Sequence, residues 1–275
     1  MKSQSMLFTI YGEYIRHYGN EIWVGSLTRL MSEFGLTEQA IRAAISRMMK
    51  QGWLESRKIG NRSYYKMSTR GKKRLDEAAK RIYKEVSDEW DGKWRIVCYN
   101  IPEEKRGLRD KLRKELSWMG FGMLANSTWI SPHNLINRVK DISELYDINE
   151  HIEFFDCDHF GWSTPEQLVK RCWDLNEIND KYQEFVKEYS PRFNELKQRI
   201  ENADKIQDSY CFVEKTILVH EYRKFLFIDP NLPEVLLPDF WVGKEADRLF
   251  RNYYQLLNEG AIRFFHANFE VAPVD

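Results

Sequence analysis

Apolar residues in the first 50 positions recur at the spacing of amphipathic helices. A first run predicts a helix over about residues 5–17, and a second predicts a helix that ends before Gly35. The third run follows the i, i+3, i+4, i+7 pattern of a helix with one buried face. Thr37 is a favourable N-cap for this third helix, and Gly52 is a favourable C-terminal residue. The third run consists of Ile41, Ala44, Ile45 and Met48.

After Gly52 the pattern changes from helix to strand. Residues 53–58 and 63–67 form two short runs around Gly60-Asn61, a pair that favours the two-residue turn of a β-hairpin. A fourth helix is expected over about residues 70–87. Three helices, a hairpin and a helix predict a winged helix-turn-helix domain at residues 1–87.

The rest of the chain predicts two further domains. Asp88 to Gly92 is expected to be a linker, and residues 93–160 then alternate as β-α-β-β-α-β, the order of a ferredoxin-like domain. Residues 164–275 are expected to be mainly helical. The predicted helices run from a capping box at Thr164 to about residue 189, from Pro191 onward, over about 208–225, and over 244–258. The fold class is therefore α+β, with a mainly helical C-terminal domain.

Charge is divided unevenly along a chain whose net charge is zero. Residues 1–87 contain 17 Lys and Arg against 8 Asp and Glu, a balance of +9. The remainder contains 25 basic and 34 acidic residues, a balance of −9. A basic N-terminal segment followed by an acidic remainder is typical of a protein whose N-terminal domain binds a polyanion.

Cysteine and hydropathy patterns indicate a cytoplasmic protein. Cys98, Cys157, Cys172 and Cys211 form no C-x-x-C pair, so buried free thiols are expected rather than disulfides or zinc ligands. No apolar stretch approaches the roughly 18 residues of a membrane helix. We therefore expect no membrane partner.

The outer face of the third helix has the composition of a DNA-recognition helix. Arg can donate two hydrogen bonds to guanine, and Gln pairs with adenine. The helix residues expected at DNA are Thr37, Gln39, Arg42, Ser46, Arg47 and Lys50. The hairpin residues expected at the DNA backbone are Arg57, Lys58, Asn61 and Arg62. A charged helix face is often only solvated, but the basic hairpin and the local charge favour DNA binding.

Several motifs together resemble one family. They are LFTIYGEY at 7–14, EIWVGSL at 21–27, AIRAAISR at 40–47, GWL at 52–54, GNRSYY at 60–65, DPNLP at 229–233 and LPDFW at 237–241. In these segments the chain resembles the PaaX family, bacterial repressors of phenylacetic acid degradation genes. The resemblance covers nearly the whole chain. It implies a three-domain architecture in which the helical domain at 164–275 serves effector binding and dimerisation. It also implies a homodimer on a partly palindromic operator in double-stranded DNA, released by an aryl-acyl-CoA such as phenylacetyl-CoA.

An acyl-CoA effector needs cations for its phosphates and an apolar slot for its acyl group. The candidate effector-binding residues are Arg171, Trp173, His220, Arg223, Lys224 and Trp241. Aromatic residues at helical spacing are also common in protein cores, so each of these also fits a structural role. No cofactor and no enzymatic activity are expected.

The middle segment also resembles small CRISPR-associated endoribonucleases, which carry a functional Asp at the end of their first strand. The corresponding sequence here is Cys98-Tyr99-Asn100-Ile101, which has no Asp. The segment is therefore interpreted as a spacer or dimerisation element. Two alternatives remain. One is a metal-dependent nuclease that cleaves with the middle domain and uses the N-terminal winged helix for targeting, and the other is a non-specific nucleic-acid binder.

One cluster of potential metal ligands lies near the end of the predicted last strand of the middle domain. Its members lack the spacing of a known metal site, so an exposed polar edge is the preferred interpretation. The cluster consists of His151, Asp156, Asp158 and His159.

Overall fold

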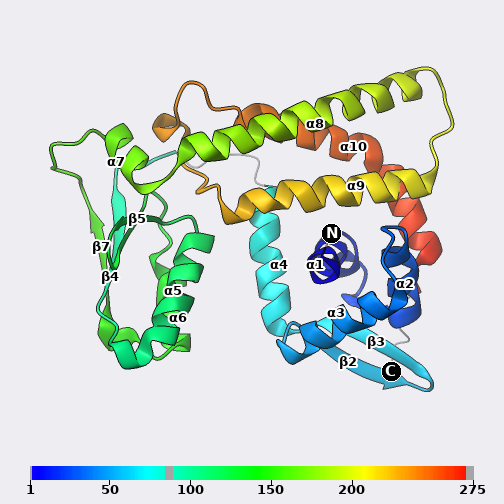
Figure 1. Cartoon of the computed structure of the whole chain (residues 1–275), viewed down its shortest axis with the longest axis horizontal. Coiled ribbons are helices and arrows are strands. Elements are labelled where there is room, and N and C mark those ends of the chain that lie inside the picture. The colour runs from blue at the N-terminus through cyan, green and yellow to red at the C-terminus, as the bar shows by residue number, and fades with distance from the viewer. Residues whose placement is uncertain (1, 84–88, 271–275) are drawn as a thin grey trace. The chain divides into compact units, whose positions relative to one another are not determined.

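The computed structural model describes residues 2–83 and 89–270 and divides the chain into two compact units (Figure 1). The first unit combines Met1–Tyr83, Phe185–Arg223 and Glu245–Asp275, and the second combines Lys84–Glu184 and Lys224–Lys244. Helices and antiparallel sheets are present, and the C-terminal region is helical. The predicted α+β class is confirmed at this level. Each unit is built from segments that are distant in the sequence.

The first unit is centred on α1. Figure 1 shows α1 nearly end-on, with α9 above it and α3 below it, and both helices contact it. The elements of its N-terminal segment are α1 (Ser3–Glu13), the 3-10 turn η1 (Ile15–His17), β1 (Glu21–Trp23), α2 (Val24–Ser32), α3 (Glu38–Lys50), β2 (Leu54–Ile59), β3 (Arg62–Met67) and α4 (Thr69–Ile82). The three strands form an antiparallel sheet in the order β1-β3-β2.

Local sequence signals account for α3 and for the hairpin after it. The hydroxyl of Thr37 accepts a hydrogen bond from the N–H of Ala40, which satisfies a free donor at the start of the helix. The buried residues of α3 are the four predicted. In the hairpin Ile59 faces Arg62, and Gly60 adopts φ +56°, which suits glycine. The predicted third helix and hairpin are thus confirmed.

Three features of this segment differ from expectation. The first helix, predicted over about residues 5–17, ends at Glu13, and Ile15–His17 form a separate 3-10 turn. The apolar stretch after residue 20 forms β1, a third strand that pairs with β3 through Glu21 and Lys66. The fourth helix begins at Thr69 and ends at Ile82. The predicted continuation of this helix to residue 87 falls largely on residues 84–88, which lie outside the described residues, as does the start of the predicted linker at Asp88.

The C-terminal helices correct the predicted breaks. The structure contains α7 (Pro165–Cys172), α8 (Leu175–Glu201), α9 (Asp208–Tyr222), the 3-10 turns η4 (Arg223–Phe227) and η5 (Glu234–Leu236), and α10 (Gly243–Asn268). The predicted single helix from 164 to 189 is wrong because the backbone is extended at Trp173, and Asp174 then caps α8 by accepting the N–H of Glu177 at 3.0 Å.

The predicted new helix at Pro191 is also wrong. Pro191 lies inside α8 and removes one backbone hydrogen bond. Tyr189 and Leu196, on either side of it, are both buried, so one apolar face continues through the proline. Helix α10 extends ten residues beyond the predicted end and buries Ala261 and Phe265 at helical spacing.

The second unit contains a four-stranded antiparallel sheet in the order β5-β6-β4-β7. Its elements are β4 (Trp94–Tyr99), the 3-10 turn η2 (Glu103–Lys105), α5 (Arg106–Trp118), β5 (Gly122–Ala125), β6 (Thr128–Ser131), α6 (Ile136–Leu145), the 3-10 turn η3 (Asn149–His151) and β7 (Ile152–Cys157). Figure 1 shows α5 and α6 on the same side of the sheet. The predicted β-α-β-β-α-β order is observed. The helix expected at Pro132 begins later, at Ile136, and the capping box at Thr164 is present.

The described helices show no membrane-spanning segment: none is both long enough and apolar enough to cross a bilayer.

Candidate nucleic-acid interface and ligand cavity

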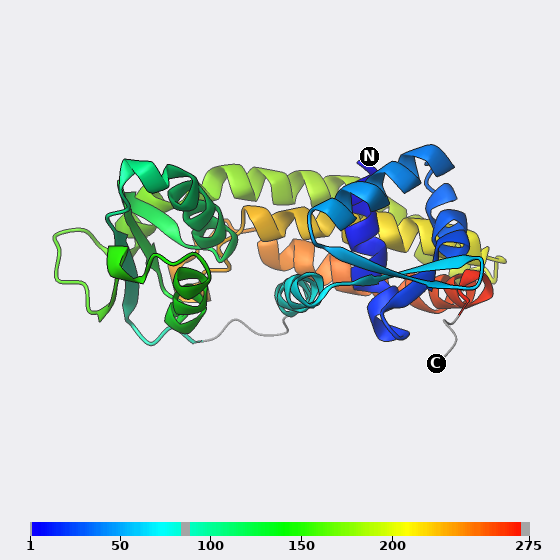
Figure 2. The ribbon, with the colours of Figure 1, turned by 90° about the horizontal axis from the view of Figure 1, so that it is seen from below.

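The outer face of α3 is exposed along its whole length, opposite the buried face. In Figure 2 this helix and the β2–β3 hairpin lie on the same face of the first unit. The exposed residues of this face include all six that sequence reasoning placed at DNA: Thr37, Gln39, Arg42, Ser46, Arg47 and Lys50. Ala43 is exposed between them, and its small side chain permits close approach to a groove floor. Their role at DNA stays a prediction.

The cations of α3 are only weakly engaged. Arg42 pairs with Glu38 one turn earlier at 2.7 Å, and both side chains are 60% exposed. Pairs of this kind contribute about 0.3–0.5 kcal/mol, so an anionic ligand could displace Glu38 at little cost. Among the described residues, Arg47 and Lys50 form no ion pair.

The hairpin holds its cations in different environments. Lys58 and Asn61 are exposed. Arg57 is half-buried and donates to the carboxylate of Glu21 at 2.7–3.0 Å through two nitrogens. Its guanidinium is therefore held within the sheet by a partner 36 residues away, which sequence reasoning missed. The predicted contact of Arg57 with DNA must compete with this bidentate pair.

Arg62 takes part in a cluster that the sequence did not indicate. Its guanidinium lies over the ring of Trp23, 4.4 Å from the centroid, and donates to Glu270 at 2.6 Å. Arg29 donates to the other oxygen of the same carboxylate at 3.0 Å. We call Arg29 and Arg62 the arginine pair. Glu270 follows α10, so the C-terminal end of the described chain reaches the hairpin.

A buried charge cluster joins the N-terminal segment to the C-terminal helices within the first unit. The ammonium of Lys215 lies 2.7 Å from the carboxylate of Glu13, and both side chains are at most 2% exposed. Lys215 also donates to Asn258 at 2.7 Å, and Glu13 accepts from the phenols of Tyr83 and Tyr254. Burial, reinforced by the negative charge of Glu13, raises the pKa of both phenols, so they remain protonated donors.

Burial also acts on the cation of this cluster. It lowers the pKa of Lys215, and the negative charge of Glu13 opposes that shift. No sequence signal connects α1 with α9 across more than 200 residues.

The six candidate effector-binding residues are not gathered at one site. In the first unit, His220 is buried and hydrogen bonds to Thr9 at 2.9 Å, and Arg223 donates to the carbonyl of Ser5 at 2.8 Å. Burial lowers the pKa of Arg223 to about 10. Two of the six therefore have partners on α1. The other four, Arg171, Trp173, Lys224 and Trp241, belong to the second unit.

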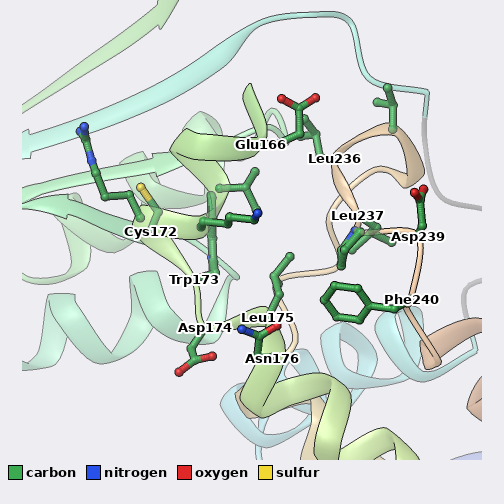
Figure 3. A pocket seen from close by; sticks show the side chains of 15 residues that line it. Glu166, Cys172, Trp173, Asp174, Leu175, Asn176, Leu236, Leu237, Asp239 and Phe240 are labelled. Carbon is green, nitrogen blue, oxygen red and sulfur yellow. The ribbon is translucent and has the colours of Figure 1, made fainter. Parts of the chain in front are cut away.

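Arg171 and Trp173 line a cavity of about 810 Å³ within the second unit (Figure 3). Its walls are α7, the start of α8 and the segment 235–240. Trp173 is fixed there because its indole N–H donates to the carbonyl of Gly120 at 3.2 Å. Sequence reasoning missed Lys170 and Phe240, which also line the cavity. Lys224 and Trp241 are not part of its lining, and Trp241 packs edge-on against Tyr182.

The residues of the predicted polar edge lie at both ends of β7, since His151 precedes the strand and Asp156 lies near its other end. Asp156 pairs with Arg95 at 3.5 Å, and His151 lies 3.4 Å from the ammonium of Lys105. Across residues 2–83 and 89–270, no group of three or more His, Cys, Asp or Glu side chains is positioned to hold a metal ion.

The cysteines are free thiols, as expected, but only Cys211 is buried. The expected burial of Cys98, Cys157 and Cys172 is wrong, since each is partly exposed.

Comparison with known proteins places the whole chain in one family. The family description "PaaX-like protein" matches residues 2–71, "PaaX protein central Cas2-like domain" matches 87–169, and "PaaX-like protein C-terminal domain" matches 173–267. The chain is 34% identical over 263 residues to the transcriptional repressor PaaX of Escherichia coli (strain K12), covering 94% of this chain and 82% of that protein. The chain therefore belongs to the PaaX family.

A solved structure shares the fold. It is the uncharacterized protein Rv0674 from Mycobacterium tuberculosis, which matches with a TM-score of 0.52 and 22% identity over 86% of this chain and 89% of that one. At this identity the likeness supports the arrangement of elements and carries no information on function.

Proposed function

We propose that this protein is a DNA-binding transcriptional repressor whose first 87 residues act as a winged helix-turn-helix. The observation that carries the proposal is α3: one face is buried in the unit, and the opposite face is exposed, polar and basic, beside a basic hairpin. Such a helix fits the major groove, and such a hairpin fits the phosphate backbone. The curated relative from Escherichia coli is itself a transcriptional repressor.

The proposed roles divide between bases and phosphates. Gln39, Arg42, Ser46 and Arg47 face bases, while the hairpin from Arg57 to Arg62 faces the backbone. A preferred duplex would be selected from a random pool and compared with a scrambled duplex. R42A should lose about 1–3 kcal/mol on the selected duplex and almost nothing on the scrambled one. K58A should weaken binding to both.

Exposed Lys197 of α8 supplies the control for this comparison. K197A removes the same charge as K58A outside the proposed interface and should leave both affinities unchanged. Equal losses on both duplexes for R42A and K58A would refute the division of roles. An unmodified protein that binds both duplexes equally would instead be a non-specific nucleic-acid binder.

The second unit is proposed to contain a ferredoxin-like domain that serves as a spacer or dimerisation element. The strand order β5-β6-β4-β7 with α5 and α6 on one side supports this fold. The strand β4 ends without an Asp, which disfavours the nuclease alternative. A homodimer on a partly palindromic operator is expected, and light scattering with and without the selected duplex tests it.

An aryl-acyl-CoA, such as phenylacetyl-CoA, is the proposed effector, and the cavity of the second unit is its proposed site. Its volume of about 810 Å³ lies in the range of small-molecule sites. Lys170 and Arg171 offer cations for phosphates, and Trp173 and Phe240 offer apolar surface for the acyl group. Binding would favour a conformation with lower affinity for the operator.

Thermal shift and mobility shift test the effector together. Phenylacetyl-CoA should raise the melting temperature and release the selected duplex, whereas free CoA and phenylacetate should do neither at the same concentration. R171A should weaken the response. K181A removes a partly exposed cation on α8 that does not line the cavity, and it should leave the response unchanged. Undiminished DNA binding at saturating phenylacetyl-CoA would refute this effector.

A further inference from the structure

The arginine pair converges on one anion. Glu270 places one carboxylate oxygen 2.6 Å from a guanidinium nitrogen of Arg62 and the other 3.0 Å from one of Arg29. Two guanidinium groups repel each other when close together, so their convergence is stabilised by a shared negative charge. The arrangement is therefore that of a small anion site.

Groups other than the Glu270 carboxylate also hold the arginine pair, and one of them, the Ser26 hydroxyl, additionally accepts the backbone N–H of Glu270 at 3.2 Å. The ring of Trp23 lies 4.4 Å from the guanidinium of Arg62 and 5.7 Å from that of Arg29. The buried hydroxyl of Ser26 accepts a hydrogen bond from Arg29 at 3.2 Å. Cation–π contact and this hydrogen bond hold both side chains in place, so the site can persist after the carboxylate leaves.

The site flanks the proposed recognition helix. Arg62 directly follows the hairpin turn, and Arg29 lies on α2, the helix that precedes α3. In helix-turn-helix proteins the helix before the recognition helix crosses the DNA backbone, and phosphate contacts fix the docked orientation. Arginine is also the side chain best suited to bind phosphate oxygens.

We propose that the arginine pair binds a phosphate of the DNA backbone, and that Glu270 occupies this site when DNA is absent. This inference rests on the proposed function. The side chains of Arg29, Arg62 and Glu270 are 50%, 51% and 40% exposed, so water weakens the pairing and a phosphate can displace the carboxylate. The end of α10 thus competes with DNA for part of the interface. This competition should affect the binding of DNA of any base sequence, because a phosphate contact does not distinguish between bases.

Fluorescence anisotropy with a labelled random-sequence duplex of about 40 base pairs tests the competition. E270Q removes the competing charge at a partly exposed position, and affinity should rise about two- to tenfold, as expected for loss of the two exposed ion pairs that Glu270 forms. E259Q removes the same charge from an exposed position of α10 where the carboxylate lies near Arg263, and affinity should not change. The gain from E270Q should disappear when Arg29 and Arg62 are both replaced by Ala.

A salt series on the same duplex tests the phosphate contact itself. Replacing both arginines by Ala should reduce the slope of log affinity against log salt by about 0.9, the value for one phosphate. Equal affinities of E270Q and the unmodified protein would overturn the competition. An unchanged slope in the double arginine variant would overturn the phosphate site. If the unmodified protein binds the duplex but one of these two results is found, the proposed anion site fails while the proposed function stands. If neither the unmodified protein nor any variant binds DNA, the proposed function fails as well.

Discussion

The buried pair of Glu13 and Lys215 leads to a prediction of large magnitude. K215M replaces the ammonium by an apolar group of similar length and leaves the Glu13 carboxylate in a site where it is 2% exposed. An unpaired buried charge destabilises a protein by about 3–5 kcal/mol. For a folded unit of this size, each kcal/mol shifts the melting temperature by roughly 2–4 °C. The melting temperature should therefore fall by roughly 6–20 °C.

The reverse substitution tests the same pair from the other side. E13Q leaves the ammonium of Lys215 beside Asn258 and the rings of Tyr14 and Tyr254. Because Glu13 opposes the lowering of the pKa of Lys215 by burial, that pKa should fall further in E13Q. The double variant should lose about 1–3 kcal/mol less than the two single variants together, since their effects are coupled.

Thermal unfolding and hydrogen exchange provide the assay. Exchange should accelerate in the amides of α1 and α9, which carry the two partners. K197M serves as the control, because Lys197 forms an exposed pair with Glu201 at 3.9 Å and should contribute less than about 0.5 kcal/mol. A K215M protein within about 1 kcal/mol of the parent, or strictly additive effects in the double variant, would refute the reasoning.

Three further predictions concern local structure. G71A should destabilise the fold by about 1–3 kcal/mol, because its Cβ would lie 2.7 Å from the carbonyl oxygen of Trp53. G107A, on an open helix surface, should instead stabilise the fold by about 0.5–1 kcal/mol. Chemical denaturation measures the free energy of unfolding of both variants and shows whether the two changes have opposite signs. T164A removes the capping box of α7 and should lose about 1 kcal/mol, while T164S should retain most of it; equal stability would contradict the cap. Burial raises the pKa of Cys172 to about 11. Its alkylation at pH 8 should therefore be slower than that of free cysteine, and the rate should increase as the pH approaches this pKa. Peptide mapping measures the rate, and fast labelling at pH 8 would exclude the raised pKa.

The sequence predicts features whose determinants lie close together along the chain. The cap at Thr37, the spacing from Ile41 to Met48 and the turn at Gly60 all act within a few residues, and the corresponding elements are observed. The exposed face of α3 follows directly from the same spacing, so its candidate DNA-contacting residues could be named in advance. The α+β class follows from the order of such local signals.

Contacts between distant segments could not be predicted in this way. Glu21 engages Arg57 because β1 joins the sheet, and Glu270 engages Arg62 because α10 is ten residues longer than its clearest apolar pattern. Local backbone chemistry predicts a helix break at Pro191, but packing on both sides of it maintains the helix. The contacts of His220 and Arg223 with α1 could not be predicted either, because burial against a distant helix leaves no mark in the sequence.

The contacts of the N-terminal segment with α9 restrict how the proposed DNA-binding segment can evolve. Thr9 hydrogen bonds to His220, and the phenol of Tyr14 pairs with the hydroxyl of Thr216 at 3.1 Å. Recombination that exchanges only the first 83 residues between relatives would mismatch these buried polar pairs wherever the relatives differ at them. We therefore expect positions 9 and 220, and positions 14 and 216, to covary across the family. New DNA specificities should arise by point changes on the exposed face of α3 more readily than by exchange of the whole segment.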